Sequence, residues 1–229
     1  MRLPRFSQLI ADGLEPLLLY WLVFGQLLLL YRLLELSVAS PTNALLLTGV
    51  PLLILLLNHA ARHARSRCLH MSLLMVVLAH LGILLGAMLD FGPQGLLILA
   101  GLCGSLTDLS PQVLWSIVST APWTFAGMLV GSNLAMLFSN RMFAWDAQAT
   151  TSNVIMYPVC NIGMLTGMLM MEVLVPATWF TSDPRIGVMI MLLLMLLGMG
   201  AGMLLSWWLL GRLSSLVSSQ RLVSHGVTP

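Results

Sequence analysis

The stretch NVIMYPVCNIGMLTGMLMMEVLVP, residues 153–176, decides the fold class. It is long enough to cross a bilayer as a helix and carries one charge, near its far end. Gly163 and Gly167 have the spacing that lets another helix approach closely. Five other residues recur every four positions and so form one slowly winding, sulfur-rich face of the helix: Met156, Cys160, Met164, Met168 and Glu172. The stretch therefore predicts a transmembrane helix.

Composition extends this interpretation to the whole chain of 229 residues. Hydrophobic residues make up 59%, charged residues only 8%, and the mean hydropathy is +0.95. A soluble domain could not cover so large an apolar surplus with polar surface. We expect an all-α, polytopic membrane bundle with one transmembrane domain over residues 14–210. An interfacial segment, residues 1–13, precedes it, and a cytoplasmic tail, residues 211–229, follows.

The apolar runs predict six crossings. Residues 95–106 are also apolar but would be only about 18 Å long as a helix, so we expect a re-entrant or half-length helix there. Ser110 and Pro111 suit a cap and a first helical position, and we expect an interfacial helix over residues 111–120. The six predicted spans cover residues 14–36, 44–58, 71–91, 123–138, 153–176 and 186–210.

The basic residues orient the bundle. All ten are arginines, and Arg62, Arg65 and Arg67 form the main cluster, between two spans. An excess of arginine marks cytoplasmic loops. With six crossings and both termini in the cytoplasm, every cluster falls inside and only the isolated Arg185 falls outside. We therefore expect a multi-pass protein of the cell inner membrane, with the Arg62 loop facing anionic headgroups.

A few polar side chains lie within or next to the spans. His80 is near the middle of the third span, where an ionisable group indicates function, although a neutral histidine bonded across the bundle is the competing interpretation. Asp90 comes just before Gly92, where that helix should end. Arg32 and Glu35 are three residues apart, so we expect them to pair at the end of the first span.

Glycines predict close helix packing. Four spans each contain one Gly-x-x-x-Gly pair, and four such pairs on different helices indicate a tightly packed bundle. Shifting the sequence by 81 or 71 residues superposes these pairs and some neighbouring methionines, as an internal duplication would, although a low-complexity chain produces similar matches. The pairs are Gly82 with Gly86, Gly127 with Gly131, Gly163 with Gly167, and Gly198 with Gly202.

Methionine is the compositional anomaly. Of 17 methionines, ten fall within residues 156–203, against about four for uniform scatter. Thioethers and a thiol are soft ligands that suit Cu(I), and a ladder of weak sites would let an ion pass. Methionine is also a flexible core filler, so packing is the competing interpretation. The last span repeats the four-residue row with Met191, Met195, Met199 and Met203.

Two functions follow from these features. The first is a transporter or membrane chaperone for a soft metal such as Cu(I), with the two methionine rows and His80 as ligands. The second is a non-enzymatic assembly subunit that binds partner membrane proteins or a second copy through its glycine faces. Within the spans the sequence has no nucleophile–base pair, P-loop or dinucleotide fingerprint. We therefore expect contact with the lipid bilayer, no catalytic residues and no nucleic-acid partner. The sequence names no cofactor beyond the Cu(I) that the sulfur rows suggest.

Overall fold

The computed structural model describes residues 4–36, 40–63, 67–104, 110–142, 150–174 and 184–224. These parts of the chain contain helices and no strand, which confirms the all-α fold class. Five helices begin at a proline, whose fixed φ angle and missing N–H suit the first helical position. The elements are α1 (Pro4–Leu33), α2 (Pro41–His63), α3 (Arg67–Phe91), η1 (Gly92–Gln94), α4 (Gly95–Gly104), α5 (Pro111–Thr120), α6 (Pro122–Met142), α7 (Thr150–Leu174) and α8 (Pro184–Ser224).

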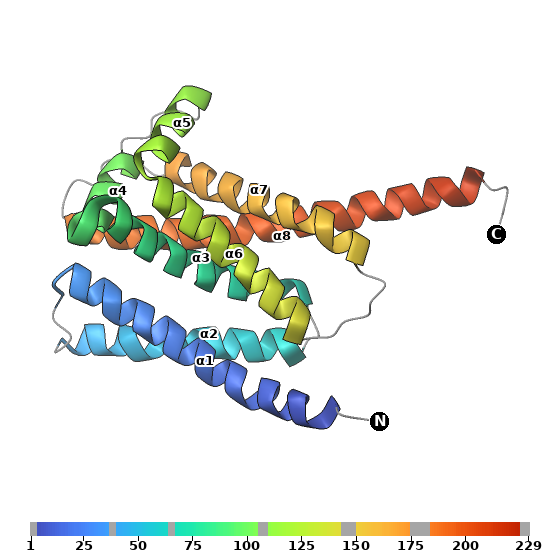
Figure 1. Ribbon diagram of the computed structural model, residues 1–229, viewed down its shortest axis with the longest axis horizontal. Helices are drawn as coiled ribbons and strands as arrows, with labels where there is room; N and C mark the ends of the chain where they lie inside the picture. The colour runs from blue at the N-terminus through green and yellow to red at the C-terminus, as the bar shows by residue number, and fades with distance from the viewer. Residues whose placement is uncertain are drawn as a thin grey trace.

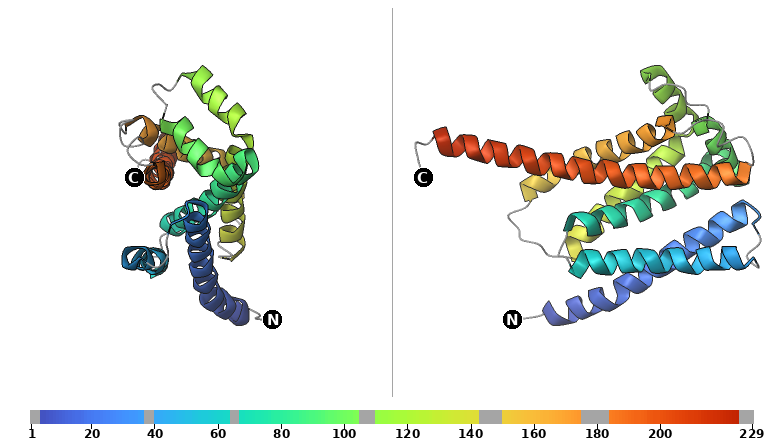
Figure 2. Two further views of the ribbon diagram at one scale, coloured as in Figure 1. Left: turned by 90° about the vertical axis from the view of Figure 1, so that its left-hand side faces the viewer. Right: turned by 180° about the vertical axis from the view of Figure 1, so that it is seen from behind.

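The third helix, rather than the stretch at residues 153–176, is the centre of the bundle. α3 packs against α1, α2, α4, α6 and α8. Figures 1 and 2 show the α1–α2 hairpin on one side of α3 and α6, α7 and α8 on the other. α3 ends at Phe91. The next residue, Gly92, has a φ of +72°, which favours glycine, and the chain turns there through η1 into the short α4.

Glycines make the tightest helix contacts, as predicted. At the crossing of α3 and α6, a Cβ atom on Gly82 would overlap the carbonyl of Gly127, and one on Gly127 would overlap Gly82. Gly86 lies in the same way against the backbone of Trp123 and Thr124, and Gly131 against Leu78. Only residues without a side chain allow two backbones to come this close.

The second glycine crossing joins α7 to α8, and its register differs from the first. Gly167 lies against Gly198, and Gly163 against Gly202. In the α3–α6 pair, the first glycine of each motif faces the first glycine of the other. In the α7–α8 pair, the first faces the second, which is a displacement of four residues, or one helical turn. Both helix pairs thus cross through the same kind of glycine-to-backbone contact. Their origin by internal duplication stays a prediction.

Among the described residues, four helical stretches are long and apolar enough to cross a membrane: Leu14–Leu33, Pro41–His63, Leu69–Leu102 and Arg185–Leu209. The chain is therefore a membrane-type helical bundle in which length and composition identify four candidate spans among the described residues, and not the six that were predicted. The predicted fourth and fifth spans fall in α6 and α7, whose described side chains, residues 122–138 and 157–170, form stretches too short to be counted among the four. Both carry polar residues in their middles, among them Ser132, Asn133 and Asn161.

The ends of the bundle also differ from the prediction. α1 is continuous from Pro4, so the segment before residue 14 is not a separate helix. α8 continues to Ser224, well into the predicted tail, and Figure 1 shows it projecting beyond the other helices. α5 covers residues 111–120, as expected, with Trp115 73% exposed on its surface. Glu35 pairs with Arg185 at 3.7 Å instead of with Arg32.

Candidate functional sites

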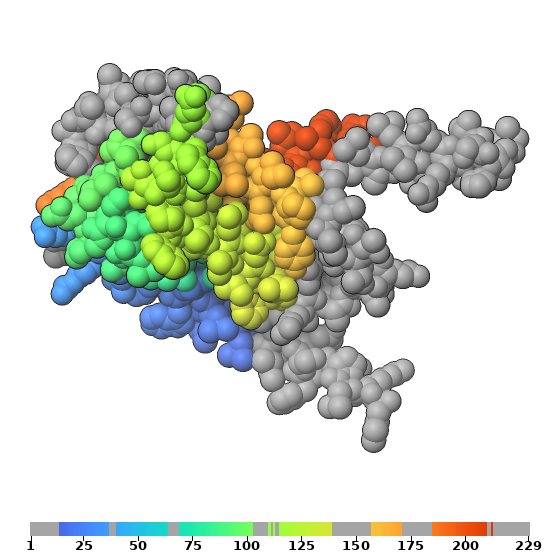
Figure 3. Space-filling view, turned by 45° about the horizontal axis from the view of Figure 1, so that its top comes forward, coloured from blue at the N-terminus to red at the C-terminus, as the bar shows by residue number. Residues whose placement is uncertain are grey.

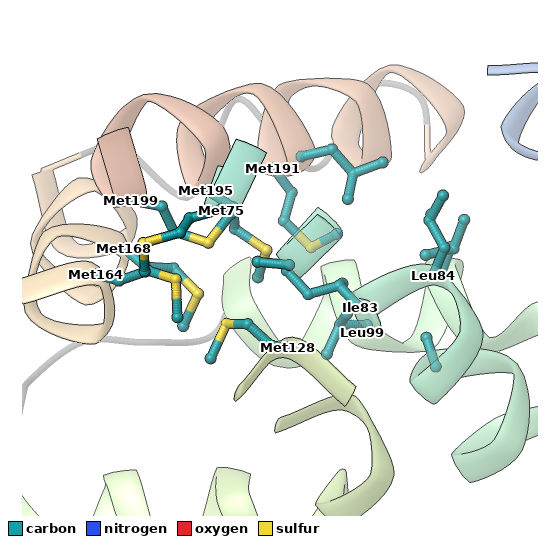
Figure 4. Packing of buried hydrophobic residues seen from close by; sticks show 14 of the residues in the cluster. Met75, Ile83, Leu84, Leu99, Met128, Met164, Met168, Met191, Met195 and Met199 are labelled. Atoms are coloured by element: carbon teal, nitrogen blue, oxygen red, sulfur yellow. The ribbon is translucent and has the colours of Figure 1, made fainter. Parts of the chain in front are cut away.

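The two predicted methionine rows meet in the main core. Cys160, Met164 and Met168 of α7 are buried in one cluster with the row of α8, and no member of these rows that the cluster contains is more than 3% exposed. Figure 4 shows the side chains of Met164 and Met168 beside those of Met195 and Met199. The row of α8 is complete in this cluster: Met191, Met195, Met199 and Met203. The side chains of Met156 and Glu172 lie outside the described part of the structure.

Other helices add methionines that the sequence analysis did not assign to a site. Met75 of α3 is 1% exposed, and Met128 and Met136 of α6 are similarly buried. Figure 4 shows the sulfur of Met75 close to those of the α7 and α8 rows, with Met128 next to the group. The sequence did carry one signal for Met75: the possible repeat, with a shift of 81 residues, superposes it on Met156. Because α3 lies between the helix pairs, it brings this thioether into the core.

His80 does not join the methionine rows. Its ring faces α1, where Nδ1 lies 3.0 Å from Oε1 of Gln26. Gln26 Nε2 in turn donates a hydrogen bond to the carbonyl of Val77, also at 3.0 Å. The sequence left open whether His80 was a ligand or a histidine bonded across the bundle. The geometry supports the second interpretation. It leaves Nε2 of the ring without a hydrogen-bond partner among the described residues.

A buried charge cluster joins α1, α2 and α3. Both oxygens of Glu15 accept hydrogen bonds: Oε1 from His70 Nε2 at 2.8 Å and Asn58 Nδ2 at 3.4 Å, and Oε2 from the Arg62 guanidinium. The Glu15 and His70 side chains are only 6% and 5% exposed. Arg62 was expected to face headgroups in a cytoplasmic loop, but it points into the bundle. Its positive charge balances Glu15, which offsets part of the cost of burying either.

This cluster was missed because its partners are far apart in the sequence. Glu15 and His70 are separated by 55 residues, and nothing local predicts that they meet. The available signals were an acidic residue inside the first span and the one-turn spacing of Asn58 and Arg62, which places both on one face of α2.

Asp90 has a structural position. Its carboxylate accepts hydrogen bonds from the backbone N–H of Trp123 at 3.1 Å and of Thr124 at 2.8 Å, and from the Thr124 hydroxyl at 2.8 Å. These N–H groups belong to the first turn of α6, where they have no partner within the helix. The carboxylate therefore caps α6 from the end of α3 and fixes the level at which the two helices cross.

A polar bridge ties α6 to α7. The Ser132 hydroxyl lies 2.9 Å from Asn161 Oδ1, and Asn161 Nδ2 donates to Asn133 Oδ1 at 3.0 Å. Figure 3 shows α6 and α7 lying side by side on one face. These polar groups satisfy one another across the interface, so their presence inside the bundle carries a smaller penalty than hydropathy alone assigns.

Groups of three or more His, Cys, Asp or Glu side chains suited to a metal ion do not occur among the described residues. His59 and His63, on α2, contact each other edge to face with ring centroids 4.9 Å apart, but no third such ligand completes a site. Thioether sulfur was the other ligand type that the sequence suggested. The candidate is the methionine core.

These features define the class of protein: an all-helical, membrane-type bundle with buried charged and sulfur-rich side chains. Comparisons with known protein families, with curated proteins and with solved structures give no match. The functional assignment therefore rests on the residues of this chain alone.

Proposed function

We propose that the protein is an integral membrane protein that binds a soft monovalent cation, Cu(I), among the thioethers of α3, α7 and α8. One observation carries this proposal: side chains from three helices gather their sulfur atoms in one part of the core (Figure 4). Thioethers favour Cu(I) over harder ions such as Mg²⁺ or Ca²⁺. The methionines in this group are Met75, Met164, Met168, Met195 and Met199.

The spacing of the rows supports transfer in addition to binding. Both rows repeat every four residues, so similar ligands recur at each turn of α7 and of α8. Several weak sites in series allow an ion to move without being trapped at any one. Pro158 cannot donate a backbone hydrogen bond within α7, and the carbonyl left without that donor lies one turn earlier in the helix. This local weakness in the helix lies next to Cys160, at one end of the row.

The glycine contacts weaken the alternative, an assembly subunit that binds partners through its glycine faces. All eight predicted glycines lie against the backbone or a side chain of this chain. A partner protein could reach these faces only by displacing α6 or α8. Partner proteins, or a second copy of the chain, would therefore have to use other surfaces.

We also propose that α6 and α7 cross the bilayer together with the four apolar stretches. α6 packs along α3, and α7 along α8, through the glycine crossings. A helix in backbone contact with a transmembrane helix over several turns occupies the same depth. Six crossings would put both termini and the arginine-rich ends of the helices on the cytoplasmic side of an inner membrane.

The test is a Cu(I) competition titration of the purified full-length protein against a chromophoric chelator. Met164→Leu nearly preserves volume but removes a ligand, and Cys160→Ser replaces soft sulfur with oxygen. We expect the wild-type protein to bind Cu(I) and the double variant to bind it at least about tenfold more weakly, or about 1.4 kcal/mol. The matched control is Met170→Leu, because Met170 is on α7 but is 51% exposed.

Three outcomes decide the proposal. Retained binding by Met170→Leu and weakened binding by a folded double variant would support it. A wild-type protein that leaves Cu(I) on the chelator would overturn it and leave the methionines as packing. Equal binding by the wild-type protein and the double variant would also overturn it, because the ion would then sit elsewhere.

A further inference from the structure

The seam between α1 and α3 contains a second buried polar site, independent of the methionine core. Gln26 and His80 are 5% and 7% exposed, and they meet where α1 passes α3. Around them, packing is by side chains alone: Leu19, Val23 and Val77 form a small buried cluster. No backbone-to-backbone glycine contact closes this seam, unlike the α3–α6 and α7–α8 crossings.

The hydrogen bonds fix the tautomer of His80. The Val77 carbonyl can only accept, so the Gln26 amide presents its nitrogen to Val77 and its oxygen to His80. An oxygen at that position requires a donor, so Nδ1 of His80 carries the proton. In the neutral ring, Nε2 is then an unprotonated acceptor. It is buried and has no hydrogen-bond partner among the described residues.

The other titratable groups of the neighbouring helices bond elsewhere. Glu15 pairs with Arg62 and His70 near one end of the seam. At the other end, the Tyr31 hydroxyl donates to Asn43, and Asp90 caps α6. None of these groups hydrogen-bonds to His80. Its Nε2 is therefore a basic nitrogen inside the bundle with no protein group assigned to it.

We infer that Nε2 of His80 is an intramembrane proton-binding site. A hydronium ion reaching the seam would transfer its proton to the Nε2 lone pair, leaving water and an imidazolium. The Nδ1–H bond to Gln26 survives this step, because Nδ1 is a donor in both states. The new Nε2–H has no acceptor among the described residues, so the cation must be solvated by water that enters between α1 and α3.

Proton uptake at this site therefore opens the seam. The apolar contacts at Leu19, Val23 and Val77 are the ones that entering water would separate. The methionine core lies on other faces of α3 and would stay closed. The site makes α1 an acid-responsive element of the bundle, whether or not the thioethers bind Cu(I).

Nitrogen-15 NMR of histidine in the full-length protein in lipid nanodiscs tests the site directly. At alkaline pH, we expect His80, identified by its loss in His80→Gln, to show the Nδ1–H tautomer, and on acidification an imidazolium signal. Gln26→Leu removes the acceptor for Nδ1–H and should convert the signal to the Nε2–H tautomer or a mixture. An Nε2–H tautomer in the wild-type protein, or a ring that stays neutral at every pH at which the protein folds, would overturn the inference.

Spin labels test the opening. Trp21 of α1 and Leu85 of α3 are 59% and 48% exposed, so labels at these positions can report the separation of the two helices. We expect the distance distribution to shift to longer distances on acidification and to return at alkaline pH. His63→Gln, which changes an exposed histidine of α2, should keep this response, and His80→Gln should lose it. An equal shift in His80→Gln would assign the response to another group and overturn the inference.

Discussion

Gly163 and Gly202 lie against each other where α7 crosses α8, so closely that a Cβ atom on Gly202 would overlap the Gly163 carbonyl. Gly200, two residues earlier on α8, has open space around its Cα. The two glycines of one helix therefore predict opposite effects. Gly202→Ala should destabilise the bundle by about 1–3 kcal/mol through overpacking. Gly200→Ala should stabilise it by up to about 1 kcal/mol, because alanine loses less conformational entropy in a helix.

The measurement is reversible unfolding in mixed micelles, with both variants compared with the wild-type protein. Gly167→Leu should show the larger cost of a branched side chain at the same crossing. Loss of stability in Gly200→Ala equal to that in Gly202→Ala would contradict the assigned contact face.

The Glu15 cluster predicts a strong coupling between two charges. Glu15→Leu leaves Arg62 without its carboxylate, and Arg62→Met leaves a buried carboxylate without its cation. Each change should cost about 3–5 kcal/mol, and the double variant should cost clearly less than the sum. Unfolding free energies of the four proteins give the coupling. Glu35→Gln is the control, because that carboxylate is 83% exposed in its pair with Arg185 and should contribute less than about 1 kcal/mol.

Asp90 should behave as a helix cap supplied by another helix. Asp90→Ala removes the acceptor for two backbone N–H groups of α6 and should cost about 0.5–2 kcal/mol. Asp90→Asn keeps one carbonyl oxygen and should cost less. Hydrogen exchange at Trp123 and Thr124 measures the local effect, which should exceed the change elsewhere in α6. A uniform increase in the rate of hydrogen exchange along α6 would indicate loss of the whole α3–α6 contact instead.

The bridge between α6 and α7 should stabilise the bundle modestly. Asn161→Leu removes the partner of both Ser132 and Asn133 and should cost about 0.6–2 kcal/mol. Thr166→Val is the control on an exposed position of the same helix. An Asn161→Leu variant as stable as Thr166→Val would show that the amide is dispensable.

The number of crossings can be decided at one position. A cysteine at Met142, where α6 ends, should be labelled from the cytoplasmic side if α6 crosses the bilayer. If only the four apolar stretches cross, the same position lies on the opposite side, together with the start of α5. Labelling intact cells with a membrane-impermeant reagent separates the two. Both topologies place the end of α8 in the cytoplasm, so a cysteine beyond it is the control.

The sequence predicted well what depends on local periodicity. The short helices α4 and α5, the glycine contacts and the two methionine faces all follow from spacing along a single helix. Asn161 and Ser132 satisfy each other only in the folded bundle, so hydropathy overstates the cost of placing these two side chains inside it.

Contacts between distant residues were not predictable. His80 and Gln26 are 54 residues apart, and the tautomer of His80 depends on a carbonyl that only tertiary packing brings to Gln26. The same holds for Arg62, which an arginine count assigns to a loop although Glu15 draws it into the bundle. Charge patterns orient the spans, but they do not reveal which charges are neutralised.

The one-turn difference between the glycine registers has a mechanical consequence. On α7 and α8, both the glycines and the sulfur-bearing residues recur every four positions. The contact pattern along the interface therefore repeats about every 6 Å. Sliding α8 along α7 by four residues would set Gly163 opposite Gly198, the arrangement that the α3–α6 pair already adopts. Sulfur-bearing residues of the two helices would still face each other. The same shift would set Gly167 opposite Leu194 and Gly202 opposite Val159, so the glycines themselves favour the present register, in which all four face one another.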